Sequence, residues 1–348
     1  MILNYILMKE IKSIKKKGAL KKIFAKLCRI LGFELVDQST LALPASKSND
    51  IYQLSTPGKK SITLGLGETA ITRKVKEIDI IIKTCTSVQL VTQKKKRVFE
   101  HEKSEYTFRT INSLIKAAFE LQKKFPKIDI NFTIIDMGSI NTDINKIKSI
   151  FSNKFKAKFI FLDPNNLKIL PKVIKRENNE IEKNMSTTMA SIYESLVEAS
   201  KSKDLVYFVE DDYIHKEDSL VEMVFAYEKI SSIFKRELFL LSTDYPYLYK
   251  KFDNTNIIFG EKYHWRTVQE SLLTFLTSYQ MIEKYLTKLK EMAKNESSPF
   301  EKNLHEIYEN EICLSPIPSL SVHCSNINSA FGISPNINIH KLWSENEV

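Results

Sequence analysis

The chain has 348 residues, of which 43% are hydrophobic and 27% charged; these are the proportions of a folded globular protein and exclude a disordered or fibrous chain. No apolar run reaches the roughly 18 residues that a membrane span needs, and a signal peptide's charged start, apolar block and cleavage site are missing. The net charge of +10 lies mostly in one terminal segment rather than around a groove, which argues against nucleic-acid binding. We therefore expect a cytoplasmic protein.

Residues 1–32 form a basic segment, with nine Lys or Arg against one Glu, so that +8 of the net charge lies here and +2 remains for the rest. From Ala19 to Leu31 the apolar residues recur at helical spacing on one face and the basic residues lie opposite. This amphipathic helix predicts either peripheral docking on the anionic inner face of a membrane or packing against the rest of the chain. Residues 33–75, with Pro44 and Pro57, are typical of an irregular connector.

The cysteines are too dispersed for a disulfide framework or a zinc site. They are Cys28, Cys85, Cys313 and Cys324, and no two form a CxxC pair. We expect buried thiols in a reducing compartment.

Beyond residue 76, predicted strands and helices alternate. The strands are 78–84, 130–135, 159–162 and 205–209, and the helices between them include 106–121 and 184–199. This alternation predicts one α/β domain over residues 76–348, with a mainly parallel open sheet flanked by helices.

Three consecutive acids, Glu210-Asp211-Asp212, follow the predicted strand 205–209 directly. Their mutual repulsion is commonly relieved by Mg²⁺ or Mn²⁺, which take hard oxygen ligands and bridge diphosphates. The alternative is an acidic helix N-terminus, but Lys216-Glu217-Asp218 lies nearer the next predicted helix. Because open α/β sheets bind ligands at the carboxyl ends of their strands, we favour a metal site.

This order of elements resembles the core of GT-A glycosyltransferases of the family 2 type over about residues 76–325. The acids stand where those enzymes carry their DxD motif, in the segment Tyr207-Phe208-Val209-Glu210-Asp211-Asp212, and strand 130–135 is followed by Asp136-Met137-Gly138-Ser139. The resemblance implies a hexosyltransferase-like enzyme that moves a sugar from a nucleotide-sugar donor to a glycan or glycolipid acceptor, as in cell-surface polysaccharide synthesis. It also implies Mn²⁺ or Mg²⁺ as cofactor.

The resemblance further implies individual roles for residues around the donor. The metal would be held by Asp212, supported by Glu210 and by a late histidine, His323. The donor would be bound by Thr84, Cys85, Thr86, Asp136 and Asp211. Met137 departs from the polar residue that many members carry there, so the nucleotide base stays open.

An acceptor site is predicted between the acids and His323. Aromatic rings pack on the CH faces of sugars, while polar groups bind their hydroxyls. The predicted acceptor residues are Tyr245, His264, Trp265 and Arg266. The alternative for each aromatic residue is a place in the core.

An inverting transferase needs a carboxylate that takes the proton of the acceptor hydroxyl. We favour inversion with Glu301 as this base and Asp244 as the second candidate, whereas a retaining enzyme would need neither. Two other functions stay open. One is a metal-dependent phosphotransferase or nuclease, although the eight glycines form no GxxxxGK[ST] loop. The other is a non-catalytic membrane-surface protein on a degenerate transferase fold.

Overall fold

A computed structural model describes residues 19–33, 70–87, 99–177, 179–250, 254–324, 334 and 336–348. The chain divides into two compact units, Met1–Thr72 and Arg73–Val348. Much of the predicted basic segment (1–18) and of the connector (34–69) lies outside the described residues.

The first unit contains helix α2 (Ala19–Ile30), where the amphipathic pattern predicted a helix. The helix ends at Ile30, and Gly32 just beyond it has a φ of +82°, which is readily adopted only by glycine. The Phe33 amide donates to the Cys28 carbonyl at 2.8 Å, and the Gly32 amide donates to the Arg29 carbonyl. Together these bonds satisfy carbonyls that a helix end would otherwise leave open. None of the described helices is long and apolar enough to span a bilayer.

Among its described residues, the second unit is built on a nine-stranded sheet with the order β3-β2-β1-β4-β9-β6-β10-β8-β7. The strands are β1 (Glu77–Thr84), β2 (Asp129–Asp136), β3 (Ala157–Phe161), β4 (Leu205–Glu210), β6 (Phe239–Leu241), β7 (Ile257–Phe259), β8 (His264–Thr267), β9 (Phe275–Ser278) and β10 (Cys313–Ile317). Only β8 and β9 run against the rest, so seven of the nine strands share one direction. The expected open sheet with mostly parallel strands is therefore present.

The central strands have the composition that burial on both faces requires. β1 reads EIDIIIKT and β4 reads LVYFVE, and such nearly continuous apolar runs are typical of parallel strands covered by helices on each side. Ile80 and Ile82 are fully buried, as are Tyr207 and Val209 in β4. This core fixes the register of β1 and β4, on which the candidate site depends.

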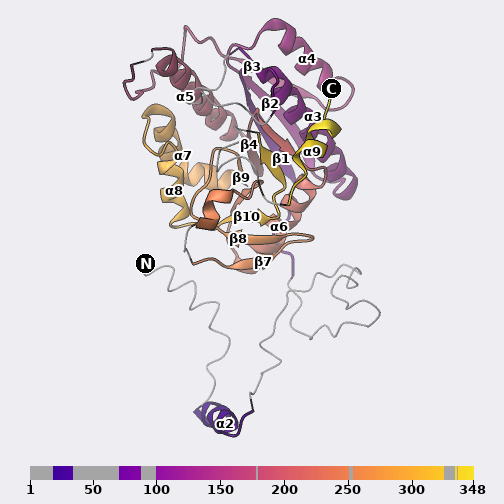
Figure 1. Cartoon of the computed structure of the whole chain (residues 1–348), viewed down its shortest axis with the longest axis vertical. Helices are drawn as coiled ribbons and strands as arrows, with labels where there is room; N and C mark the ends of the chain where they lie inside the picture. The colour runs from indigo at the N-terminus through magenta and orange to yellow at the C-terminus, as the bar shows by residue number, and fades with distance from the viewer. Residues whose placement is uncertain are drawn as a thin grey trace. The chain divides into compact units, whose positions relative to one another are not determined.

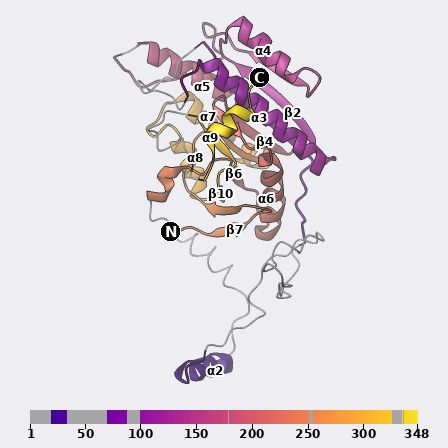
Figure 2. The ribbon, with the colours of Figure 1, turned by 45° about the vertical axis from the view of Figure 1, so that its right-hand side comes forward.

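Helices cover both faces of the sheet (Figures 1 and 2). One group packs together around α3 and the other around α5 and α7. The first group is α3 (Lys103–Lys124), α4 (Asn141–Phe151) and α6 (Ser219–Phe234), and the second is α5 (Asn179–Ala199), α7 (Tyr279–Lys294) and α8 (Lys302–Tyr308). The short 3₁₀ helix η3 (Pro246–Lys250) follows β6.

A small second sheet pairs β5 (Tyr213–His215) with β11 (Ser321–His323) in antiparallel register. Beside it a separate apolar cluster docks the C-terminal helix α9 (Ile339–Glu345) against α3. There the Arg109 guanidinium lies 4.4 Å from the Trp343 ring centre and donates to the Trp343 carbonyl at 2.8 Å. The second sheet thereby brings a late part of the chain beside the end of β4.

The four cysteines are free thiols, as predicted. Cys313 and Cys324 are buried, but Cys28 and Cys85 are partly exposed, so the expectation of burial holds for two of the four.

Candidate functional site

The predicted donor and metal residues meet at the carboxyl edge of β1, β2 and β4. Thr84 pairs with Asp136 across β1 and β2, and Lys83 pairs with Glu210 across β1 and β4. Parallel strands in register end together, so the turns after these strands share one edge of the sheet. The residues predicted to bind the donor and the metal therefore follow strand ends that lie side by side, and their roles stay a prediction.

Each of the three acids interacts with different residues. Glu210 accepts from the Lys83 ammonium at 3.4 Å, and its side chain is about a quarter exposed. Asp211 and Asp212 are both buried. Asp212 Oδ2 lies 3.4 Å from His323 Nε2. Lysine side chains thus reduce the repulsion at Glu210 and Asp211, whereas Asp212 lies beside a histidine.

Asp211 connects the end of β4 to the turn after β1 and to α3. Its Oδ2 accepts from the Cys85 amide and from the Thr107 hydroxyl, each at 3.1 Å, and lies 3.3 Å from the Lys103 ammonium. Lys103 and Thr107 were not predicted as site residues. A signal did exist, because Lys103 is the first residue of α3, where the helix dipole disfavours a cation unless an acid compensates it.

Asp136 organises the turn after β2. Its Oδ1 accepts from the amides of Gly138 at 3.1 Å and Ser139 at 3.0 Å, and its Oδ2 accepts from the Thr84 hydroxyl at 2.8 Å. At 2% exposure the carboxylate shapes the turn from inside. Direct contact with a base or ribose stays a prediction.

The turn after β1 is open enough to meet a ligand. Cys85 is partly exposed, and burial is the main cause that raises the pKa of its thiol. The Thr86 amide donates to the Ser139 hydroxyl at 2.9 Å. The Thr86 hydroxyl is buried and has no hydrogen-bond partner among the described residues. Such an orphaned polar atom is unusual in a folded protein and fits a site completed by a ligand.

The pairing of β11 with β5 brings His323 to the acids. His323 lies opposite Tyr213, and the Cys324 amide donates to the Asp212 carbonyl at 2.8 Å. The rings of His323 and Tyr213 stack, with centroids 4.5 Å apart and planes 7° from parallel. The Tyr213 and Tyr245 hydroxyls are 2.8 Å apart. This chain of contacts fixes the histidine ring beside Asp212.

Asp212 and His323 have a spacing that fits two ligands of one ion. Ligand bonds of about 2.1 Å at right angles separate two ligand atoms by about 3 Å, close to the 3.4 Å observed. Within the described ranges, no group of three His, Cys, Asp or Glu side chains forms a complete metal cluster. A divalent ion would take its other ligands from a diphosphate and water, as Mg²⁺ commonly does.

Glu301 immediately precedes α8, and the charges of nearby site residues act on its carboxyl group. Burial raises its pKa from 4.5 to about 7; the negative charge of Glu210 acts in the same direction, and Lys83 and His323 act against it. A carboxylate of this kind can accept a proton near neutral pH.

Asp244, the second candidate for the base, lies in the core instead. It is fully buried, its Oδ1 accepts from Arg266 at 2.7 Å, and its Oδ2 accepts from the Tyr249 hydroxyl. Burial raises the pKa of Asp244, while these partners act in the opposite direction. A carboxylate enclosed in this way cannot reach an acceptor hydroxyl, so its observed role is structural.

The predicted acceptor residues do not form one exposed surface. Tyr245 and Trp265 are completely buried, and the Trp265 indole donates to Glu222 at 3.0 Å. Arg266 is occupied by Asp244 and stacks over the Tyr249 ring. His264 alone of these four predicted residues has an exposed side chain. The core alternative is therefore correct for both aromatic residues, since a buried ring cannot contact a sugar.

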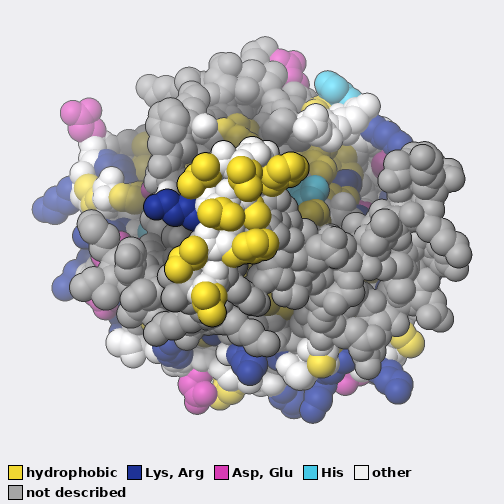
Figure 3. Space-filling view, turned by 90° about the horizontal axis from the view of Figure 1, so that it is seen from below, with side chains coloured by type: hydrophobic (Ala, Val, Ile, Leu, Met, Phe, Trp, Pro, Cys, Tyr) yellow, Lys and Arg dark blue, Asp and Glu magenta, His cyan; other side chains and the backbone are white. Residues whose placement is uncertain are grey.

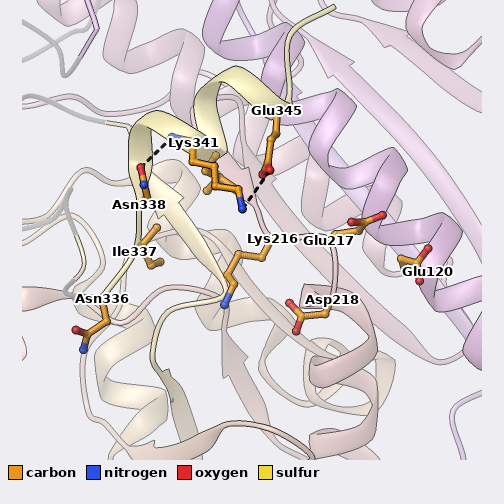
Figure 4. A pocket seen from close by; sticks show the side chains of 10 residues that line it. Glu120, Lys216, Glu217, Asp218, Asn336, Ile337, Asn338, Lys341 and Glu345 are labelled. Atoms are coloured by element: carbon orange, nitrogen blue, oxygen red, sulfur yellow. Dashed lines mark hydrogen bonds and ion pairs between the residues drawn. The ribbon is translucent and has the colours of Figure 1, made fainter.

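A separate open cleft of about 490 Å³ lies after β5 (Figure 4). Its lining combines acids, lysines and amides from the end of α3, the turn before α6, and α9. Lys341, for example, lies 3.6 Å from Glu345. The cleft includes none of the predicted site residues, and its mixed charges single out no ligand class.

Comparison with known proteins gives no match to a family model or to a curated protein. Similar solved structures include the galactosyltransferase LgtC in complex with donor and acceptor sugar analogs, at 13% identity and a TM-score of 0.30 over 62% of this chain and 65% of that one. Another is mouse xyloside xylosyltransferase 1, at 8% identity and 0.32 over 67% and 76%. A third is 4-diphosphocytidyl-2C-methyl-D-erythritol synthase from Anaerococcus prevotii, at 13% and 0.33 over 78% and 96%.

This chain thus spans slightly less than two thirds of the galactosyltransferase it matches. TM-scores near 0.3 carry no argument about activity. The fold rests on its own strand order, with the acids at the end of β4, and this arrangement agrees with the GT-A type that the sequence resembles.

Proposed function

We propose that the chain is a metal-dependent glycosyltransferase that moves a sugar from a nucleotide-sugar donor to a hydroxyl of a glycan or glycolipid. The observation that carries this proposal is that Asp212 and His323 lie 3.4 Å apart beside the end of β4, while the charges of Glu210, Lys83 and His323 act on Glu301. The first pair has the spacing of metal ligands, and Glu301 has the pKa of a general base.

Asp212 and His323 would hold Mn²⁺ or Mg²⁺, and the ion would neutralise the charge on the departing nucleotide diphosphate. Glu210 is proposed as an outer partner of the ion, because Lys83 already binds its carboxylate. Asp211 acts indirectly, since its contacts with Lys103 and Thr107 hold the strand end in place.

The turn after β1 is proposed to receive the nucleotide, with Thr84, Cys85 and Thr86 lining it. The orphaned Thr86 hydroxyl supports this placement, because a donor group would complete its hydrogen bonding. Asp136 would support the turn through its bonds to Gly138 and Ser139.

Glu301 is proposed to take the proton of the acceptor hydroxyl as that oxygen attacks the anomeric carbon and the bond to the diphosphate breaks, which inverts the configuration. A hexose is the proposed sugar. The exposed His264 is retained as an acceptor contact, and Arg266, Trp265 and Tyr245 would support the acceptor side from the core. We propose that the reaction takes place in the cytoplasm at the inner face of the membrane, within cell-surface polysaccharide synthesis.

The test is a thermal-shift screen of nucleotide sugars with and without Mn²⁺, followed by a transfer assay with the stabilising donor. The true donor raises the melting temperature by mass action. Asp212→Asn is expected to abolish the Mn²⁺-dependent part of that rise. The matched control is Asp163→Asn, an exposed acid just beyond β3 at the same edge, where Asn retains the side-chain oxygen that accepts from the Asn165 amide.

Three results would overturn the proposal. Equal metal-dependent donor binding by Asp212→Asn and Asp163→Asn would remove the metal assignment. Stabilisation by nucleoside triphosphates or oligonucleotides, but by no nucleotide sugar, would favour the phosphotransferase or nuclease alternative. Donor binding without transfer or hydrolysis under any acceptor condition would favour the non-catalytic alternative.

A further inference from the structure

Within the first unit, helix α2 carries a continuous apolar face (Figure 3). Its large apolar side chains are between 53% and 83% exposed, namely Leu20, Ile23, Phe24, Leu27 and Ile30. Leu31 and Phe33 continue the exposed apolar surface beyond the helix. At 100° per residue, the helical members fall within an arc of roughly 120°. An exposed apolar patch of this kind marks a surface that binds a membrane or another protein.

The opposite side of the helix carries basic residues, and the segment has no acid of its own. Lys26 and Arg29 are exposed on the side of the helix away from the apolar arc. Residues 19–33 contain no Asp or Glu, and the whole of residues 1–32 carries +8. An apolar stripe flanked only by cations is complementary to a surface that is apolar inside and anionic outside.

The length of α2 determines how the helix can insert into a lipid bilayer. Twelve residues at about 1.5 Å each give a helix of about 18 Å, shorter than the roughly 30 Å hydrocarbon core of a bilayer. The helix can therefore lie in the plane of the interface but cannot cross the bilayer. A second copy of α2 is a poor partner, because two such helices would bring like charges together without acids to pair them.

We infer that α2 docks the protein on the surface of an anionic lipid bilayer, with its apolar face below the headgroups and its cations over the lipid phosphates. Neither signal alone gives firm binding, since apolar insertion and polybasic attraction are each weak and act together. This docking deepens the proposed function without depending on its chemistry. It would hold the second unit at the surface where glycolipid acceptors lie.

The experiment is co-sedimentation of the full chain with vesicles. One set contains equal parts of phosphatidylglycerol and phosphatidylcholine, and the other contains phosphatidylcholine alone. We expect binding to the anionic vesicles that weakens as salt rises. A double variant, Phe24→Ser with Leu27→Ser, should lower the partition coefficient at least tenfold, and Lys26→Gln with Arg29→Gln about tenfold.

The matched controls remove the same chemistry from the second unit. Ile257→Ser deletes an exposed apolar side chain, and Lys154→Gln deletes an exposed cation; both should bind vesicles like the parent protein. Equal vesicle binding by the helix variants and these controls would overturn the inference, as would equal binding to both vesicle types. A dimer in solution that the Phe24→Ser and Leu27→Ser changes dissociate would also overturn it, in favour of a second copy as the partner. The donor-induced thermal shift of each variant tests the proposed function separately, because all the proposed donor residues belong to the second unit.

Discussion

Replacing Glu301 with Gln should stabilise the folded protein at neutral and alkaline pH while it removes most of the catalytic rate. The reason is that the surroundings of Glu301 disfavour its ionised form, mainly through burial, and raise its pKa from 4.5 to about 7. Between these values the folded chain keeps a proton that the unfolded chain has released. The free energy of unfolding therefore falls as the pH rises through this window.

The size of the effect follows from the change in pKa. At about 1.36 kcal/mol per pH unit, a rise from 4.5 to about 7 makes the ionised carboxylate about 3 kcal/mol less favourable in the folded state than in the unfolded one. Partial exposure of the side chain reduces this to about 2 kcal/mol. Gln does not ionise, so the stability difference between Glu301→Gln and the parent should grow by this amount from pH 4.5 to pH 8.

The assay is urea unfolding of both proteins across that pH range, without divalent metal. Glu306→Gln is the control, because Glu306 lies on α8, where its ion pair with Lys288 lowers its pKa; it should show no such gain in stability at high pH. In the transfer assay the parent's kcat should rise with pH through about 7. Glu301→Gln should lose that rise and about 10² to 10⁴ in kcat. A stability difference that does not vary with pH would refute the account of Glu301 as a destabilised base.

Three further substitutions test the surroundings of the site. Gly260→Ala would place a Cβ 2.0 Å from Glu222 Oε1, so unfolding measurements should show a loss of about 1 to 3 kcal/mol, and unchanged stability would contradict this packing. Asp244→Asn removes the carboxylate beside the buried Arg266 and should cost about 3 to 5 kcal/mol by denaturant unfolding; a stable variant with low kcat would instead restore Asp244 as the base. Tyr213→Leu removes the ring that stacks on His323, the proposed metal ligand. The Mn²⁺ affinity measured by titration calorimetry should therefore fall several-fold, while Tyr213→Phe should retain it. Equal Mn²⁺ affinities of the two variants would show that the Tyr213 ring does not help to position the ligand.

The strands that form the sheet edge could be predicted from the sequence, because a strand and the polar residues at its end are neighbours in the chain. β1 and β4 are apolar runs that end in polar residues, and parallel strands place such ends side by side. Thr84, Asp136 and Glu210 each lie at the end of a predicted strand or just after it, and the resemblance to GT-A enzymes assigned them to the donor and metal site. The strands after β4 were not predicted, since β6 and β7 have only three residues each and show little periodicity.

The acceptor side could not be predicted because burial there depends on distant pairings. Trp265 is covered through the contact between β8 and α6, where Glu222 binds its indole. Asp244 meets Arg266 only because β10 lies between β6 and β8 in the sheet. The local sequence contains the same aromatic or acidic residue whether that residue is exposed or buried. Only the order of the strands in the sheet distinguishes a sugar-binding residue from a core residue.

Charge balance at the acidic edge indicates which carboxylate an ion would bind. Glu210 has Lys83 as its partner, and Asp211 has Lys103, so a protein cation neutralises each of them. Asp212 faces His323, a residue that can remain neutral and ligate a metal through its Nε2 atom. Asp212 is therefore the carboxylate of the three that lies beside a second potential metal-binding atom. The three acids form one motif in sequence, but in space they serve as a paired charge, a structural anchor and the ligand we propose for the ion.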